Sequence, residues 1–361
     1  MTARKYRGVL YNVGPIVDDQ YSGVHSYSQV LFPFINECVR RGIEFTWVGE
    51  TIQNSSSNIT AIRALVRDGV YCAPVITAPQ IVYSRVSKDL LKAEDFDFLF
   101  LQPRPLENIL ESTTVDFLIR KFVDAKKRVF LFEQDMFPIS DKWKDSEYVT
   151  HLRPFFRPQD DRWKDSREFL FWHSPYAGNL HFSRDEVKRR FDFIYIGNVY
   201  GRQAAFQKFL GGLQTSNNVI FGNWVSSPDK RAFAEKPEFV NLNFCGSTDH
   251  NFTIPLMNAA PFTIQILPEH AAEVGLMTAR VFNAVSAKML CFADAAIYGA
   301  EKIFPKELIV ANAAEMNDRI AELQRNPAEY RRVLDKRDEM MKEHSVFKRV
   351  ETFKKMLEEL V

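Results

Sequence analysis

The chain has 361 residues, which is more than one ordinary domain needs and enough for two domains with separate cores. Hydrophobic residues make up 46% of the chain and charged residues 26%, a balance that excludes a disordered or fibrous protein. The formal net charge of +1 excludes a broadly basic protein, so binding to nucleic acid would require a local cluster of positive charge.

The first part of the chain alternates between strand-like and helical segments. Apolar runs predict strands at residues 7–14, 43–49, 71–77, 97–102 and 127–135. Apolar residues at helical spacing predict helices at residues 26–42 and 113–125. This alternation is typical of a parallel, doubly wound α/β sheet, in which ligands bind at the carboxyl ends of the strands.

Residues 136–190 break this pattern, because they mix aromatic residues, prolines and charges of both signs. We expect them to form an inter-domain or substrate-facing region. Strand-like runs then return at residues 191–200, 217–224, 239–246 and 288–294, with helical stretches between them. They predict a second α/β unit, and the chain from about residue 314 onward is predicted to be helical.

Cysteine spacing and hydropathy indicate the environment of the chain. Cys38, Cys72, Cys245 and Cys291 form neither a CxxC pair nor a cluster with histidine, so we predict neither a disulfide framework nor a metal site. No apolar run approaches the roughly 20 residues that cross a bilayer, and the N-terminal residues lead directly into a strand-like segment. We therefore expect a cytoplasmic monomer with reduced thiols and no membrane partner.

The strongest candidate for ligand chemistry is a loop, helix and strand within residues 275–294. An arginine in the first turns of a helix at the carboxyl edge of a sheet can reach a diphosphate, and the helix N-terminus adds N–H donors. Arg280 has this position, and Asn283, one turn later, can hydrogen-bond a ribose hydroxyl. The alternative is that Arg280 only pairs with a surface carboxylate.

Two strand-like runs of the second unit end in glycine. Gly197 and Gly222 would let a nucleotide approach the backbone closely. Asn198, Arg202 and Asn223 offer polar contacts beside them. The alternative is that each glycine only forms a turn.

In the first unit, the run at 127–135 ends in Glu133, Gln134 and Asp135. A carboxylate at a strand end can deprotonate an acceptor hydroxyl as that hydroxyl attacks an anomeric carbon, which makes Asp135 the candidate base. A capping or turn aspartate is the alternative. Earlier in the chain, Gly23 precedes a predicted helix and can face the donor phosphates, with His25 as a polar neighbour.

The irregular region contains basic residues interleaved with aromatic ones, a combination that can bind phosphates and stack on bases. The candidate DNA-binding residues are Lys142, Trp143, Lys144, Arg153, Arg157 and Arg162. Acidic residues lie among them, so an ordinary solvated loop is the alternative.

Taken in chain order, four segments resemble the phage DNA β-glucosyltransferases of the T4 type. The segments are LFEQDMFPISDKW, IYIGNV, IFGN and MTARVFNA, the last being the most specific. This family has the GT-B fold, with two Rossmann-like domains facing a cleft, and glucosylates hydroxymethylated cytosine in DNA. The resemblance implies an acceptor and DNA-binding domain at 1–185, a nucleotide-sugar-binding domain at 186–340, and a C-terminal helix at 341–361 that returns to the first domain.

Carried over to this chain, the resemblance implies that Arg280 contacts the donor diphosphate. It implies that Gly197 and Asn198 border the phosphates, and that Gly222 and Asn223 line the nucleotide pocket. Met277 and Thr278 open the matched helix and join the donor-binding candidates. The implied reaction is an inverting transfer from a UDP-sugar, with UDP-glucose expected, to duplex DNA whose modified base is flipped out. A divalent cation such as Mg²⁺ would assist UDP release, and a phage-encoded enzyme would act in the host bacterial cytoplasm.

The chain also departs from the family pattern. Asn283 stands where the family has a glutamate that holds the ribose, and Gln134 stands at the position of the catalytic aspartate, one residue before Asp135. Arg202 matches the arginines of the phosphate-binding turn only loosely. The sugar and the choice between hydroxymethylcytosine and hydroxymethyluracil therefore stay open. A glycan or small-molecule acceptor, and a non-catalytic DNA- or nucleotide-binding relative, are the alternatives.

Overall fold

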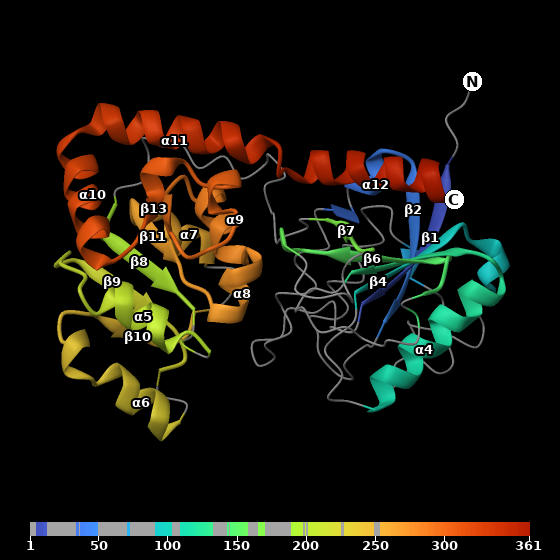
Figure 1. Ribbon diagram of the computed structural model, residues 1–361, viewed down its shortest axis with the longest axis horizontal. Coiled ribbons are helices and arrows are strands. Elements are labelled where there is room, and N and C mark those ends of the chain that lie inside the picture. The colour runs from blue at the N-terminus through green and yellow to red at the C-terminus, as the bar shows by residue number, and fades with distance from the viewer. Residues whose placement is uncertain are drawn as a thin grey trace. The chain divides into compact units, whose positions relative to one another are not determined.

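The computed structural model describes residues 5–12, 34–35, 37–49, 71–72, 91–102, 109–132, 143, 145–157, 165–169, 189–197, 199, 201–224, 227–248 and 253–361. The chain divides into two compact units (Figure 1). Unit 1 comprises Met1–His173 and Val346–Val361, and unit 2 comprises Ser174–Ser345. In the described part of the chain, no helix is both long and apolar enough to span a membrane.

Unit 1 contains a seven-stranded sheet in the order β3-β2-β1-β4-β5-β6-β7, in which the neighbouring strands are parallel. The strands are β1 (Tyr6–Asn12), β2 (Ile43–Gly49), β3 (Tyr71–Cys72), β4 (Phe98–Gln102), β5 (Arg128–Phe132), β6 (Val149–Arg153) and β7 (Arg167–Glu168). Central strands such as β4 are buried along their whole length, as expected of parallel strands that are covered on both faces. Helix α4 (Ile109–Asp124) connects β4 to β5, and a 3₁₀ turn, Ala93–Asp95, precedes β4.

Strands β6 and β7 lie inside the region that we expected to be irregular, and they correct that prediction. Strand β6 reads Val-Thr-His-Leu-Arg and pairs with β5 in parallel, Val129 opposite Val149. Its alternation of apolar and polar residues is short and ends in a charge, so it lacks the apolar run that identified the other strands. The seven-stranded sheet therefore extends two strands beyond the predicted ones.

The last helix, α12 (Val346–Leu360), belongs to unit 1, and Phe353 is the aromatic residue among its buried side chains. The Phe353 side chain is fully buried, with its ring centroid 5.0 Å from that of Phe130 and 5.4 Å from that of Phe34. The rings of Phe98, Phe100 and Phe169 also surround it. Six phenylalanine rings therefore form a cluster that binds α12 to the sheet.

Unit 2 contains a six-stranded parallel sheet in the order β10-β9-β8-β11-β12-β13. The strands are β8 (Phe193–Ile196), β9 (Asn218–Phe221), β10 (Phe244–Cys245), β11 (Phe262–Gln265), β12 (Leu290–Asp294) and β13 (Ile309–Val310). The chain runs outward from β8 to β10 and then returns to the other side of β8 with β11. The strand order thus reverses between β8 and β11, which is the point where doubly wound sheets bind ligands.

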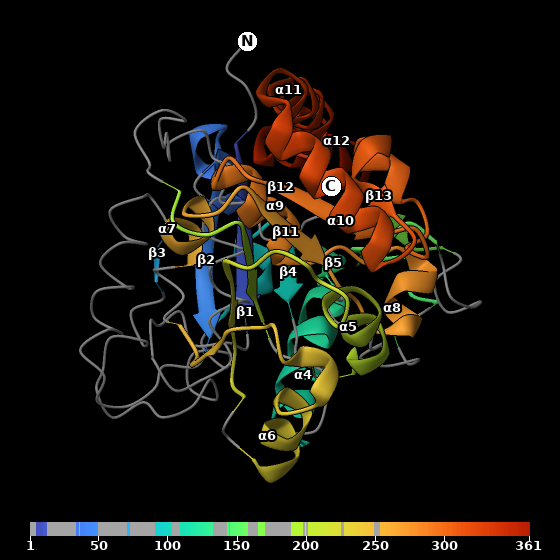
Figure 2. The ribbon, with the colours of Figure 1, turned by 90° about the vertical axis from the view of Figure 1, so that its left-hand side faces the viewer.

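Seven α-helices accompany the sheet among the described residues of unit 2. They are α5 (Gln203–Leu210), α6 (Pro228–Ala234), α7 (Thr253–Asn258), α8 (Glu269–Val274), α9 (Ala279–Ser286), α10 (Ala313–Arg325) and α11 (Pro327–Lys342). Figures 1 and 2 place α6 at the opposite end of the unit from α11. Phe206 of α5 lies at the centre of the core, with its ring 5.4 Å from Tyr195 of β8 and 5.5 Å from Trp224. These contacts fix α5 against the strand that it follows.

Candidate functional site

The candidate site lies at the carboxyl ends of β8 and β11. Phe262 pairs with Phe193, so the last residues of the two strands, Gln265 and Ile196, stand at the same level of the sheet. Helix α5 begins a few residues after β8, and α9 begins at Ala279, after β11 and α8. The side chains of their N-cap residues, Arg202 and Thr278, do not cap these helices, which leaves N–H donors open for a ligand.

Arg280 crosses this edge with its guanidinium held by neutral groups. Its Nε and Nη2 donate to the carbonyl oxygen of Ile196 at 3.3 and 2.9 Å, and its Nη1 donates to Oε1 of Gln265 at 3.4 Å. The guanidinium carbon lies 4.2 Å from the centroid of the Tyr195 ring. Arg280 is only 7% exposed, and no described carboxylate pairs with it. The alternative of a surface ion pair therefore finds no partner in the described part of the chain.

Positive charge is concentrated at this edge, and no carboxylate among the described residues pairs with Arg280. Burial lowers the pKa of Arg280 from its ordinary value, and the neighbouring charge of Arg202 lowers that pKa further. Arginine nonetheless stays protonated in proteins. The Nε atom of Arg202 is itself buried without a hydrogen-bond partner among the described residues. Because buried charge and unpaired donors are costly, two neighbouring guanidinium groups in this state favour the binding of an anion.

The two predicted glycines are required by close packing at the same edge. Gly197 has φ of +155°, and a Cβ atom built there would lie 2.4 Å from Nη2 of Arg280. A Cβ atom on Gly222 would lie 2.4 Å from the carbonyl oxygen of Gly197. Any side chain at either position would therefore displace the arginine or separate the ends of β8 and β9.

Substitution of Gly197 by alanine is expected to lower the free energy of unfolding by about 1–3 kcal/mol, because the methyl group adds backbone strain and displaces Arg280. Gly246→Ala is the matched control, since a Cβ atom there meets nothing within 4 Å. Urea unfolding of the two variants measures the difference. Equal stability of Gly197→Ala and the wild type would contradict the packing described for this edge.

The remaining donor-binding candidates of unit 2 differ in exposure. Thr278 donates its hydroxyl to Oε1 of Gln265 at 2.8 Å. Asn283 lies one turn after Arg280 on α9 and is 7% exposed, and Asn223 is exposed at the end of β9. Met277 is fully buried, so its side chain packs in the core, and a contact with the donor would come from its backbone.

Gln265 was not among the residues singled out from the sequence. Strand β11 was itself missed, although PFTIQIL is an apolar run with one amide in it. The signal that could have identified Gln265 is a polar amide inside an apolar run, because such a residue at the carboxyl end of a central strand is unusual.

Comparison with known proteins supports a carbohydrate-transfer function. Residues 184–355 match the family described as Glycosyl transferase-like. The chain has the fold of the GT-B glycosyltransferases, and the family match covers somewhat less than half of it. No curated protein sequence matches it.

Solved structures share its fold at low sequence identity. T4 phage BGT in complex with UDP and Mn²⁺ is similar with a TM-score of 0.61 and 14% identity, over 97% of this chain and 99% of that one. The DNA modifying enzyme β-glucosyltransferase, solved with and without its substrate uridine diphosphoglucose, has a TM-score of 0.63 and 14% identity over 98% and 99% of the two chains. AviGT4, a glycosyltransferase involved in avilamycin A biosynthesis, has a TM-score of 0.58 and 12% identity over 98% of each chain.

In unit 1, the candidate DNA-binding residues differ in burial. Trp143 is 9% exposed and donates from Nε1 to Asp116 of α4 at 3.1 Å. Its side chain therefore packs in the core of unit 1, and its expected contact with DNA stays a prediction. Arg153 is partly buried, and its Nη1 donates to the carbonyl oxygen of Ser166 at 3.3 Å. Of these candidates, Arg157 is exposed and accessible to a phosphate.

Several predicted site residues lie outside the described residues. They are Gly23, His25, Asp135, Lys142, Lys144, Arg162 and Asn198. Within the described ranges, no group of three His, Cys, Asp or Glu side chains is placed to hold a metal ion. Cys38, Cys245 and Cys291 are free thiols, and burial raises the pKa of Cys291 to about 12.

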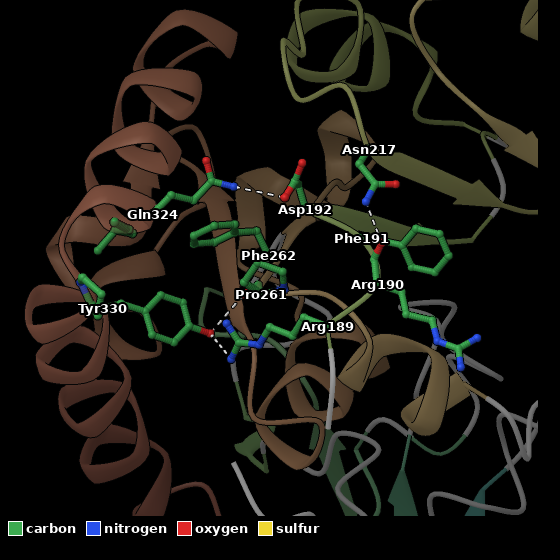
Figure 3. Close-up of a pocket in the computed structure, with 11 residues that line it drawn as sticks. Arg189, Arg190, Phe191, Asp192, Asn217, Pro261, Phe262, Gln324 and Tyr330 are labelled. Carbon is green, nitrogen blue, oxygen red and sulfur yellow. Dashed lines mark hydrogen bonds between the residues drawn. The ribbon is translucent and has the colours of Figure 1, made fainter. Parts of the chain in front are cut away.

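A separate pocket of about 310 Å³ lies at the opposite, amino-terminal edge of the unit 2 sheet (Figure 3). Its polar groups pair with one another: Arg189 donates to the hydroxyl of Tyr330 at 2.9 Å, and Gln324 donates to Asp192 at 3.4 Å. The arginine also lies over the Tyr330 ring. Since Arg189, Gln324 and Asp192 already have partners, they do not offer the unpaired donors found at the β8–β11 edge.

Proposed function

We propose that this glycosyltransferase transfers a sugar, with glucose expected, from a UDP-sugar to the hydroxymethyl group of a 5-hydroxymethylpyrimidine in duplex DNA. The observation that carries the donor half is the buried Arg280, which has no described carboxylate partner and lies beside Arg202 at the β8–β11 edge. The acceptor half is supported by the similarity to a DNA modifying β-glucosyltransferase and by the basic residues of unit 1.

The donor diphosphate would bind to N–H groups that the protein leaves unused. A guanidinium has five N–H donors, and Arg280 gives three of them to Ile196 and Gln265. The Tyr195 side chain also hydrogen-bonds the guanidinium, which leaves at most one N–H for a phosphate oxygen. The N-termini of α5 and α9 add backbone donors and the positive ends of their dipoles.

The same groups would promote the reaction. As the glycosidic oxygen leaves with UDP, negative charge grows on the diphosphate, and fixed donors in a dry site stabilise that charge more than the charge of the bound substrate. An inverting displacement would follow when the acceptor hydroxyl, deprotonated by Asp135, attacks from the opposite face of the sugar. The modified base would have to leave the helix to present this hydroxyl.

A divalent cation that assists UDP release is a further part of the proposal. T4 phage BGT was solved with Mn²⁺ and UDP. Because the described residues of this chain contain no set of three metal ligands, no step of the reaction is assigned to a cation here.

Mass spectrometry of DNA containing hydroxymethylcytosine or hydroxymethyluracil, after incubation with a panel of UDP-sugars, tests the proposal. We expect one hexose to be added to one of the two bases, and none to unmodified DNA. The mass shift identifies the sugar class, and the substrate identifies the base. Failure of every UDP-sugar to modify either DNA would contradict the DNA acceptor, and turnover on a small molecule instead would place the chain with enzymes that resemble AviGT4.

A further inference from the structure

Gln265 holds the donor-binding arginine from the sheet side. Its Oε1 accepts hydrogen bonds from Nη1 of Arg280 at 3.4 Å and from Oγ1 of Thr278 at 2.8 Å. Both donors belong to the start of α9, so one amide oxygen joins the end of β11 to the first turn of this helix. An arginine can only donate, which fixes the oxygen of the amide toward Arg280.

The amide itself is fully buried and only partly satisfied. Gln265 is 0% exposed, and its Nε2 has no hydrogen-bond partner among the described residues. A buried glutamine with an unpaired N–H₂ group costs more than an apolar side chain of the same shape. Hydrophobic packing therefore does not explain a glutamine at this position.

The choice between an amide and a carboxylate matters for the arginine. Glutamate would have the same shape and would bind the guanidinium more strongly, but it would cancel the positive charge in a site of low dielectric constant. Glutamine accepts a hydrogen bond and leaves the charge of Arg280 available to an anion. Its Nε2 adds a second donor in the same place.

We propose that Gln265 is a positioning residue that orients Arg280 toward the donor diphosphate while leaving the guanidinium charge unneutralised. This inference rests on the proposed function, because it concerns how the diphosphate is recognised. If this role is correct, the residue at the end of β11 helps the site to select a charged nucleotide over a neutral nucleoside.

Calorimetric titration of the full chain with UDP and with uridine tests the assignment. Gln265→Glu is expected to lower the affinity for UDP by about tenfold or more, because it pairs Arg280 with a carboxylate, and to leave the weak binding of uridine nearly unchanged. Gln265→Met, which has similar length and no charge, is expected to weaken UDP binding less. The unfolding temperature of Gln265→Glu should be no lower than that of the wild type, since the new ion pair replaces a neutral hydrogen bond.

The two failures can be distinguished. If the wild type does not bind UDP, the proposed function fails before the variants are considered. If the wild type binds UDP and Gln265→Glu binds it equally well, the role assigned to Gln265 is wrong. Thr278→Val removes the hydroxyl that orients the amide and serves as a second probe if Gln265→Glu does not fold; a UDP affinity equal to that of the wild type would overturn the inference as well.

Discussion

Replacement of Arg280 by alanine is expected to lower kcat/KM for sugar transfer by about 100-fold or more, the usual cost of removing one donor to a developing oxyanion. The reason is that Arg280 is buried at the switch point of the sheet, held by neutral groups and without a described carboxylate partner. UDP binding should weaken in parallel, and calorimetry measures it without knowledge of the acceptor.

Two variants serve as controls for this prediction. Arg331→Ala removes an exposed arginine of α11 and should leave both activity and UDP binding unchanged. Arg280→Lys keeps the charge and loses the planar fork, so it should retain part of the binding. If folded Arg280→Ala binds UDP with the affinity of the wild type, the assignment of the donor site to this edge is wrong.

Replacement of Phe353 by alanine is expected to reduce the free energy of unfolding of unit 1 by about 3–5 kcal/mol. The fully buried ring contacts five other phenylalanine rings of unit 1, so its removal leaves a cavity between α12 and the sheet. Urea unfolding followed by circular dichroism measures the change, with the two units allowed separate transitions.

Phe347→Ala is the matched control on the same helix, because the Phe347 side chain is 39% exposed. It should change stability by about 0.5 kcal/mol or less. If Phe353→Ala were no more destabilising than Phe347→Ala, α12 would not contribute to the core of unit 1 as described.

The α/β fold with parallel sheets could be predicted because most central strands are apolar runs bounded by helical segments. The run predicted at residues 43–49 coincides with β2, and the helix predicted at 113–125 overlaps α4 over residues 113–124. The predicted class, two Rossmann-like sheets of GT-B type, is confirmed by the structure and by its similarity to solved glycosyltransferases. Strands that are buried on both faces consist of nearly continuous apolar residues, which makes them easy to recognise in a sequence.

Strands without that signal could not be predicted. Strands β6, β7 and β13 are short or carry polar residues, and they owe their conformation to pairing with a strand that is already in place. The burial of the Trp143 side chain could not be predicted from its neighbours in sequence either. Its flanking lysines suggested an exposed aromatic residue, whereas its contact with Asp116 on α4, distant in sequence, places it in the core.

The candidate site was predictable where a local pattern exists and not where the contact is tertiary. The sequence of a helix start drew attention to Arg280, and the structure places that residue at the carboxyl edge of the unit 2 sheet. Gln265 belongs to no sequence motif, because its hydrogen-bond partners lie 13 and 15 residues later in the chain. The roles of both residues in donor binding are proposals.

Comparison of UDP with uridine by calorimetry, over a range of salt concentrations, tests the central claim most directly. If the arginines at the β8–β11 edge recognise a diphosphate, UDP should bind at least about tenfold more tightly than uridine, and the difference should shrink as salt screens the charges. Equal affinities for UDP and uridine, or a UDP affinity that does not respond to salt, would contradict the account.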